Sequence, residues 1–149
     1  MDYNEDLNPL KLLLDSGNNG DEFSKKIADF FPAIIYIYDV DSRKLKYINR
    51  RVTDFLGYTF EDVESWDNDF MHLVFKEDVD LVKKELHKIF SLKDDESYSY
   101  NSRLTHKQGN WKYFRTFGTV LNRDENDRAA SMLFVAQDIT PEVETGNKF

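Results

Sequence analysis

The sequence predicts an α+β fold in which a five-stranded antiparallel sheet carries helices on one face. Its carboxy-terminal half holds three extended runs separated by a turn and by a polar loop, at 98–104, 111–121 and 131–137. Two shorter runs, 34–39 and 44–49, lie close enough in sequence to form a hairpin. Between the two groups of strands, residues 76–90 carry apolar side chains at helical spacing. We therefore expect a helical crossover between the second and third strands.

Length and composition limit the class of protein. A chain of 149 residues with 40% hydrophobic residues can form one domain with a substantial core. The net charge of -8 and the pI of about 4.9 argue against direct binding to nucleic acid or to an anionic membrane. No apolar run is long enough to span a bilayer, and no signal peptide is visible, so we expect a cytoplasmic domain. The absence of cysteine excludes disulfides, thiolate metal sites and thiol catalysis.

The amino-terminal residues predict two helices ahead of the sheet. The first apolar stripe precedes a break at 16–20 and consists of Leu7, Leu10, Leu13 and Leu14. The second stripe ends at Pro32 and consists of Phe23, Ile27, Phe30 and Phe31. We place an amino-terminal helical extension at 1–20, the main domain at 21–140 and the start of an exiting linker helix at 141–149.

Two further helices and a turn are expected before the third strand. Asn49 is placed to cap a short helix that ends near Gly57, a residue suited to a helix carboxyl terminus. Thr59 and Asp62 approximate a capping box that opens a short turn before Trp66. The longest helix covers 76–90, and charged residues fill its solvent side.

The last strand leads directly into an exit from the domain. It stops at Asp138 and Ile139, after which Thr140 can cap a new helix and Pro141 suits its first turn. A central strand that continues into an outgoing helix can pass a displacement out of a domain. Asp138, Ile139 and Thr140 are therefore the predicted signal output.

The order and spacing of these segments resemble a PAS sensor domain over residues 21–140. The resemblance rests on the three carboxy-terminal strands that end in Asp-Ile-Thr, on the amino-terminal hairpin, and on the short helix followed by Leu56, Gly57 and Tyr58. It implies a non-catalytic sensory module that relays its state to an effector, most often a histidine kinase. It also implies that the leading helices cover the outer face of the sheet, either as an intramolecular lid or as the interface of a homodimer.

Strand alternation selects the candidate ligand pocket, since successive side chains point to opposite faces. By the resemblance, one set points inward, toward the helices: Tyr36, Tyr38, Tyr98, Tyr100, Tyr113, Arg115, Phe117, Met132 and Phe134. Phe55, on the short helix, is a further candidate for the pocket. In this hypothesis Arg115 receives an anionic or carbonyl-bearing small molecule. The alternative is that Arg115 pairs with an acid of the helical side, namely Asp54, Asp67 or Asp69. A position of Arg115 on the other side of the sheet from Tyr36 and Tyr100 would overturn the sensor interpretation together with the pocket.

The chain has few of the residues that hold cofactors in related sensors. The resemblance implies that flavin adduct photochemistry needs a cysteine, which the chain lacks, and a glutamine where Ala136 stands. Haem-binding relatives use a histidine on the long helix, but His87 lies near its end between lysines, which argues against haem. His72 and His106 have no metal-ligand spacing. The sequence does not identify the ligand.

Other functions stay open. The domain could be a ligand-free dimerisation scaffold, or the sensor part of a transcription regulator. A third alternative is a small α+β enzyme of the isomerase type, which would need an acid–base dyad in its pocket. The sequence has no catalytic serine, phosphate-loop or zinc-protease motif.

Overall fold

The structure, a computed structural model, describes residues 18–146 and divides into two compact units. The units are Met1–Pro32 and Ala33–Phe149. The unit that holds the sheet therefore starts at Ala33, whereas the sequence analysis places the domain boundary after residue 20. No helix of the described chain is both long and apolar enough to cross a membrane.

In the first unit the structure describes one helix, α3 (Asn18–Phe30). Asn18 and Gly20 already belong to this helix, so the predicted break at 16–20 is wrong for its last three residues. The helix ends two residues before Pro32, as expected, because proline disfavours a helical conformation in the residue before it. The predicted leucine stripe of the first helix lies outside the described residues. The covering of the outer sheet face by the amino-terminal helices stays a prediction.

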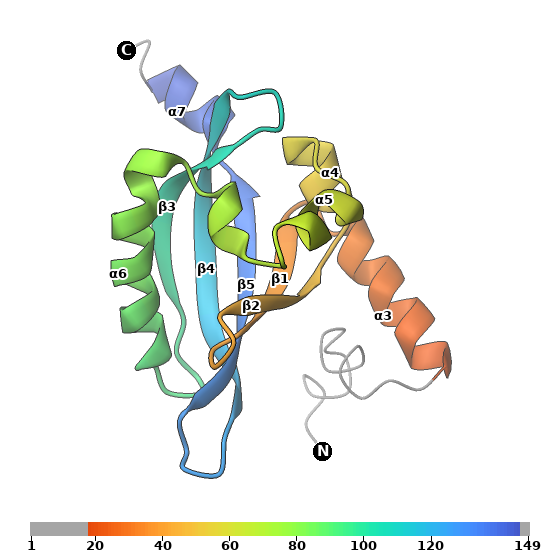
Figure 1. Cartoon of the computed structure of the whole chain (residues 1–149), viewed down its shortest axis with the longest axis vertical. Helices are drawn as coiled ribbons and strands as arrows, with labels where there is room; N and C mark the ends of the chain where they lie inside the picture. The colour runs from red at the N-terminus through yellow and green to blue at the C-terminus, as the bar shows by residue number, and fades with distance from the viewer. Residues whose placement is uncertain (1–17, 147–149) are drawn as a thin grey trace. The chain divides into compact units, whose positions relative to one another are not determined.

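The second unit contains the predicted sheet. Its strands pair antiparallel in the order β2-β1-β5-β4-β3 (Figure 1), and their bounds are β1 (Ile34–Asp39), β2 (Lys44–Ile48), β3 (Tyr98–Thr105), β4 (Trp111–Arg123) and β5 (Ala129–Asp138). The last strand along the chain is thus the central one, and the predicted fold class is confirmed. The sheet is followed by the outgoing helix α7 (Thr140–Gly146).

Helical segments fill the crossover between β2 and β3: α4 (Arg51–Leu56), α5 (Phe60–Ser65), the 3-10 helices η1 (Phe70–Leu73) and η2 (Lys76–Asp78), and α6 (Val79–Phe90). The helix predicted at 76–90 is thus a 3-10 turn followed by α6. Figure 1 shows α6 lying along β3 and β4, with α4 and α5 near β1 and β2. The buried side chains of α6 include Val82, Leu86 and Ile89, each of which contributes roughly 1.5–3 kcal/mol by leaving water.

The short helices α4 and α5 have the expected ends, with one exception. Gly57 adopts the left-handed conformation (φ 82°) that closes α4, and Thr59 and Asp62 form the predicted capping box of α5. Asn49, however, does not cap α4. Its buried Oδ1 accepts from the Ile35 amide at 3.0 Å and its Nδ2 donates to the Ala33 carbonyl at 2.9 Å. Asn49 therefore fastens the end of β2 to the start of β1.

The core is centred on Phe134 of β5, whose side chain is fully buried. Phe134 pairs with Tyr36 of β1 on one side and with Gly118 of β4 on the other. The ring of Tyr36 stacks on that of Phe134 with centroids 5.0 Å apart. A Cβ added at Gly118 would lie 2.7 Å from the Phe134 ring and 2.9 Å from Cδ1 of Ile89. The missing side chain of Gly118 thus leaves room for Ile89 of α6 and Phe134 to pack over β4.

This contact decides which face of β4 is buried, and the predicted inward set of β4 is wrong. Because Gly118 faces the helices, Phe114 and Thr116 do so too, and their exposed fractions are 0% and 2%. Tyr113, Arg115 and Phe117 occupy the opposite face, where Phe117 pairs with outward-facing residues and is 41% exposed. Both alternating sets of β4 contain aromatic residues, so hydrophobicity alone could not distinguish them.

The free edge of β3 is closed by an ion pair that the sequence analysis missed. Nε and Nη2 of Arg103 donate to the two carboxylate oxygens of Asp78, at 3.0 and 2.7 Å, and the Arg103 amide donates to Asp78 Oδ2 at 2.7 Å. The guanidinium also lies 4.5 Å from the centre of the Phe75 ring. Hydrogen bonds from Arg103 lower the pKa of the Asp78 carboxyl. Asp78 therefore joins the start of α6 to the sheet edge.

Two substitutions on β4 should test which face is buried. We expect Phe114→Ala to lower the free energy of unfolding by about 3–5 kcal/mol, because it leaves a cavity in the core. Phe117→Ala should cost less than about 1 kcal/mol, since much of that ring is already in water. Urea unfolding of the two variants and the wild type measures both values. A larger loss for Phe117→Ala would contradict the register described above.

A second prediction concerns the pH dependence of the Asp78 pair. The pKa of Asp78 is lower in the folded chain, so the pair stabilises the fold above the unfolded pKa of about 3.9 and loses this effect as pH falls through the folded value. At pH 7, Asp78→Asn should cost about 2 kcal/mol, and the gap to wild type should narrow at pH 3. Asp94→Asn, which removes an exposed partner of Arg123, is the control and should cost less than about 1 kcal/mol. A gap that stays constant between the two pH values would refute this role of Asp78.

Candidate functional site

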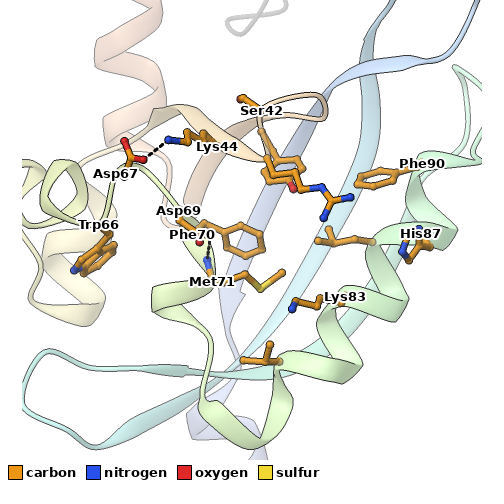
Figure 2. Close-up of a pocket in the computed structure, with 14 residues that line it drawn as sticks. Ser42, Lys44, Trp66, Asp67, Asp69, Phe70, Met71, Lys83, His87 and Phe90 are labelled. Atoms are coloured by element: carbon orange, nitrogen blue, oxygen red, sulfur yellow. Dashed lines mark hydrogen bonds and ion pairs between the residues drawn. The ribbon is translucent and has the colours of Figure 1, made fainter.

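A cavity of about 450 Å³ lies between α6, the β1–β2 turn and the segment that joins α5 to η1. This volume falls within the range of small-molecule sites. Its wall on α6 consists of residues that share one face of that helix, listed here from the amino terminus: Val79, Lys83, Leu86, His87 and Phe90. Figure 2 shows Lys83 and Phe90 on the side of the cavity opposite Phe70 and Met71.

The floor of the cavity is aromatic and buried. Tyr38 and Phe70 are 4% and 2% exposed and meet edge to face, with ring centres 5.8 Å apart. Phe90 stacks nearly parallel to Tyr38 at 6.3 Å. Burial raises the pKa of the Tyr38 phenol, while the nearby Arg43 guanidinium acts in the opposite direction. The Tyr38 hydroxyl is therefore neutral at physiological pH and can donate a hydrogen bond to a bound molecule.

One rim of the cavity is the turn between β1 and β2, which presents Arg43. The Arg43 amide donates to the Asp39 carbonyl at 2.8 Å, and the Ser42 amide donates to Asp39 Oδ2 at 2.9 Å. The hydrogen bonds from Ser42 lower the pKa of Asp39. Arg43 has a left-handed backbone (φ 61°), which costs a residue with a side chain about 1–2 kcal/mol.

The opposite rim is the loop that contains Asp67, Asn68 and Asp69. Asp67 and Asn68 both have φ 57°, a conformation that Asp and Asn tolerate better than most residues. The Asp67 carboxylate pairs with the Lys44 ammonium, and Asp69 Oδ1 accepts from the Met71 amide at 3.1 Å; both contacts are drawn in Figure 2. The two rims are thus joined by an ion pair, and strained backbone is found on both sides of the cavity.

The predicted tyrosine pocket is mostly packed core. The Tyr36 hydroxyl hydrogen-bonds to those of Tyr100 and Thr116, and burial raises the pKa of both phenols. Met132 and Phe134 are fully buried in the same core. The predicted pocket residues on β1, β3 and β5 thus lie together on the helical face of the sheet. Of the ten predicted pocket residues, however, only Tyr38 lines the cavity.

Two other predicted pocket residues pack against the margins of this core. Phe55 meets Phe114 edge to face at 6.2 Å. The Tyr98 hydroxyl accepts from Lys88 Nζ at 3.3 Å. Neither residue lines the cavity.

Arg115 cannot serve as a ligand anchor in this pocket. It occupies the outer face of β4, on the other side of the sheet from Tyr36 and Tyr100, so the predicted pocket built around it is wrong, and a sensory function can no longer be argued from these three residues. The alternative partners are also engaged elsewhere: Asp54 pairs with Arg51 at 3.3 Å, and Asp67 with Lys44.

The residues that the sequence analysis missed are Arg43 and Lys83. Lys83 was grouped with the solvent side of its helix, although it lies one turn from both Val79 and Leu86. That spacing was the available signal for Lys83. Nothing in the sequence indicates that the turn directs Arg43 toward the helix. His87 is exposed, as expected, but it also lines the cavity.

The exit from β5 is held by four hydrogen bonds. Asp138 Oδ1 accepts from the Thr140 amide at 2.9 Å, and the Ile139 amide donates to the Tyr113 carbonyl at 2.8 Å. Thr140 was expected to cap α7, but its Oγ1 instead accepts from the Tyr113 amide at 2.9 Å and contacts the Tyr113 carbonyl at 3.4 Å. The start of α7 is thus fastened to β4. Elsewhere in residues 18–146, no three His, Asp or Glu side chains gather as a metal site would require.

Comparison with known proteins supports the fold. The PAS fold family matches residues 45–136. No curated protein matches the chain. Among solved structures, the PAS domain of a protein from Colwellia psychrerythraea is similar, with a TM-score of 0.65 and 17% identity over 80% of this chain and 97% of that one.

Two further solved structures are similar to this chain and come from signalling proteins. The amino-terminal domain of a diguanylate cyclase with a PAS/PAC sensor from Marinobacter aquaeolei has a TM-score of 0.59 and 20% identity, over 74% of this chain and 97% of that one. A sensory box histidine kinase/response regulator from Burkholderia thailandensis has a TM-score of 0.64 and 12% identity, over 83% of this chain and 89% of that one.

Proposed function

This chain belongs to the PAS fold family, and we propose that it is a non-catalytic sensory module. In this proposal a small molecule binds in the cavity beside α6 and alters the exit of the chain at Asp138, Ile139 and Thr140. The occupied and empty states then differ in how firmly α7 is held against β4. A ligand can shift such a balance only by binding one state more tightly than the other.

The observation that carries the proposal is the short route from the cavity to the exit. Tyr38 forms part of the cavity floor and pairs with Met132 of β5. Its ring also meets the Phe134 ring edge to face at 6.3 Å. Six residues after Met132, the same strand ends at Asp138 and passes into α7. A displacement of Tyr38 by a ligand would therefore reach the exit through a single central strand.

We propose that this signal passes to an effector domain of the parent protein, with a histidine kinase as the first candidate. Support comes from the similar structures, two of which belong to a diguanylate cyclase and to a histidine kinase/response regulator. A homodimer formed through the amino-terminal helices belongs to the same proposal. A ligand-free scaffold is the alternative that the following experiment distinguishes.

We expect Val79→Phe to abolish ligand retention, because the larger side chain would fill part of the cavity from the first turn of α6. Native mass spectrometry of the chain purified from its host should show a bound mass in the wild type and none in this variant. Leu81→Phe is the matched control, since Leu81 is exposed on the same helix and does not line the cavity. Equal retention in all three proteins would place the ligand elsewhere. No bound mass in any of them would favour the scaffold.

A second prediction concerns the exit. Asp138→Ala should leave the thermal midpoint nearly unchanged but speed hydrogen exchange at the Thr140 and Val143 amides, because it removes the acceptor for the Thr140 amide. In the parent protein the variant should uncouple signal from output. Asp124→Ala is the control, since it removes a similar carboxylate acceptor from the β4–β5 loop, far along the strand from the exit. Unchanged exchange and unchanged output in Asp138→Ala would rule out this role.

A further inference from the structure

The charge of the cavity is opposite to that of the chain. The whole chain carries a net charge of -8, yet the cavity is lined by three basic residues, Arg43, Lys44 and Lys83, against Asp67 and Asp69. In two other surface hollows of the described chain, basic residues are balanced or outnumbered by acidic ones. The cavity is therefore a site on an otherwise acidic protein that attracts an anion.

Three of these five charged residues already have partners, and among the described residues Arg43 and Lys83 do not. Lys44 and Asp67 neutralise each other across the cavity mouth, and Asp69 accepts from the Met71 amide. Within residues 18–146, neither Arg43 nor Lys83 forms an ion pair with a carboxylate. Figure 2 shows Lys83 projecting from α6 toward the segment that carries Phe70 and Met71. Two cations thus remain for a bound molecule.

The backbone at Arg43 indicates that its side chain has a use beyond the turn. Glycine or asparagine would adopt φ 61° with less strain, yet the residue is an arginine, and it lines the cavity. Burial raises the pKa of the Tyr38 phenol, and the positive charge of Arg43 acts against this larger effect. Strained residues that persist in this way are concentrated at ligand sites.

The remaining surface of the cavity is apolar. Phe70 and Leu86 are 2% and 4% exposed, and Tyr38 and Phe90 add stacked rings. Such a wall suits the hydrocarbon or aromatic body of a ligand and offers it few polar partners. Once Lys44 and Asp67 neutralise each other, Arg43 and Lys83 against Asp69 leave one net positive charge, which a monoanion would balance.

Building on the proposed sensory function, we infer that the ligand is a small monocarboxylate with an aromatic or apolar body. Its carboxylate binds Arg43 and Lys83, and its body packs on Tyr38, Phe70 and Phe90. The planar guanidinium matches a carboxylate through paired hydrogen bonds, and the lysine ammonium adds a second charge-assisted contact. The molecule is held by this surface and undergoes no reaction.

Three probes of one shape isolate the effect of charge: 3-phenylpropionate, 3-phenylpropanamide and 3-phenylpropylammonium. Isothermal titration with the whole chain should show the carboxylate binding about tenfold or more tightly than the amide, because a charge-assisted hydrogen bond contributes roughly that factor. The ammonium should bind more weakly than the amide. Amide chemical shifts should change at Tyr38, Phe70 and Leu86, which would place the probe in the cavity.

Variants test the two cations. Lys83→Gln should weaken carboxylate binding about tenfold and leave amide binding unchanged. Arg43→Asn should do the same, and asparagine tolerates the left-handed backbone. Lys84→Gln is the matched control, because it removes the same charge from the neighbouring position, which does not line the cavity. Circular dichroism of each variant confirms that it is folded before the titration.

Several results would overturn the inference: equal binding of carboxylate and amide, tighter binding of the ammonium, no loss in either variant, or no binding of any probe. These failures are distinct from failure of the proposed function. If native mass spectrometry still shows a molecule that Val79→Phe expels, the sensory site stands and only the ligand class is wrong. If no molecule is retained and no probe binds, both proposals fail together.

Discussion

The architecture depends on one close contact, in which Ile89 of α6 meets Phe134 of β5 over the bare backbone of Gly118. A side chain at this position would separate α6 from the sheet, since its Cβ would stand 2.7 Å from the Phe134 ring. The contact seats the carboxy-terminal half of α6 on β4 and, through the strict alternation of a strand, assigns every other β4 residue to a face. The burial of Phe114 and the exposure of Phe117 follow from it.

The same contact accounts for the position of the cavity. Ile89 and Leu86 are buried near the carboxyl end of α6, and the Asp78–Arg103 ion pair holds its amino end at the sheet edge. The helix is therefore supported along β3 and β4, while its remaining face turns toward the β1–β2 turn and η1. Space for a ligand is left on that side, beside Tyr38. The cavity lies next to the central strand that leads to the exit.

The contrast between the tyrosine cluster and the cavity is chemical as well as spatial. Tyr36, Tyr100 and Thr116 bring their hydroxyl groups together inside the core, where burial raises the pKa of both phenols. Arg43 and Lys83 lie at the cavity with no carboxylate partner among the described residues. Polar groups that have already found partners stabilise a fold, whereas partly exposed cations near an apolar wall are suited to binding. This difference is the basis for assigning the ligand site to the second group.

The sequence alone predicts the fold class, the central place of the last strand, the capping box at Thr59 and the glycine end of α4 at Gly57, because these depend on local chemistry and on spacing along the chain. It could not choose between the two faces of β4, since aromatic residues occur on both and only the packing of Ile89 and Phe134 over Gly118 decides. The sequence also could not show that Arg43 lies at the cavity beside α6, or that Asn49 joins β2 to β1 instead of capping α4. Those placements join segments far apart in sequence, and only the tertiary structure sets the distances between them.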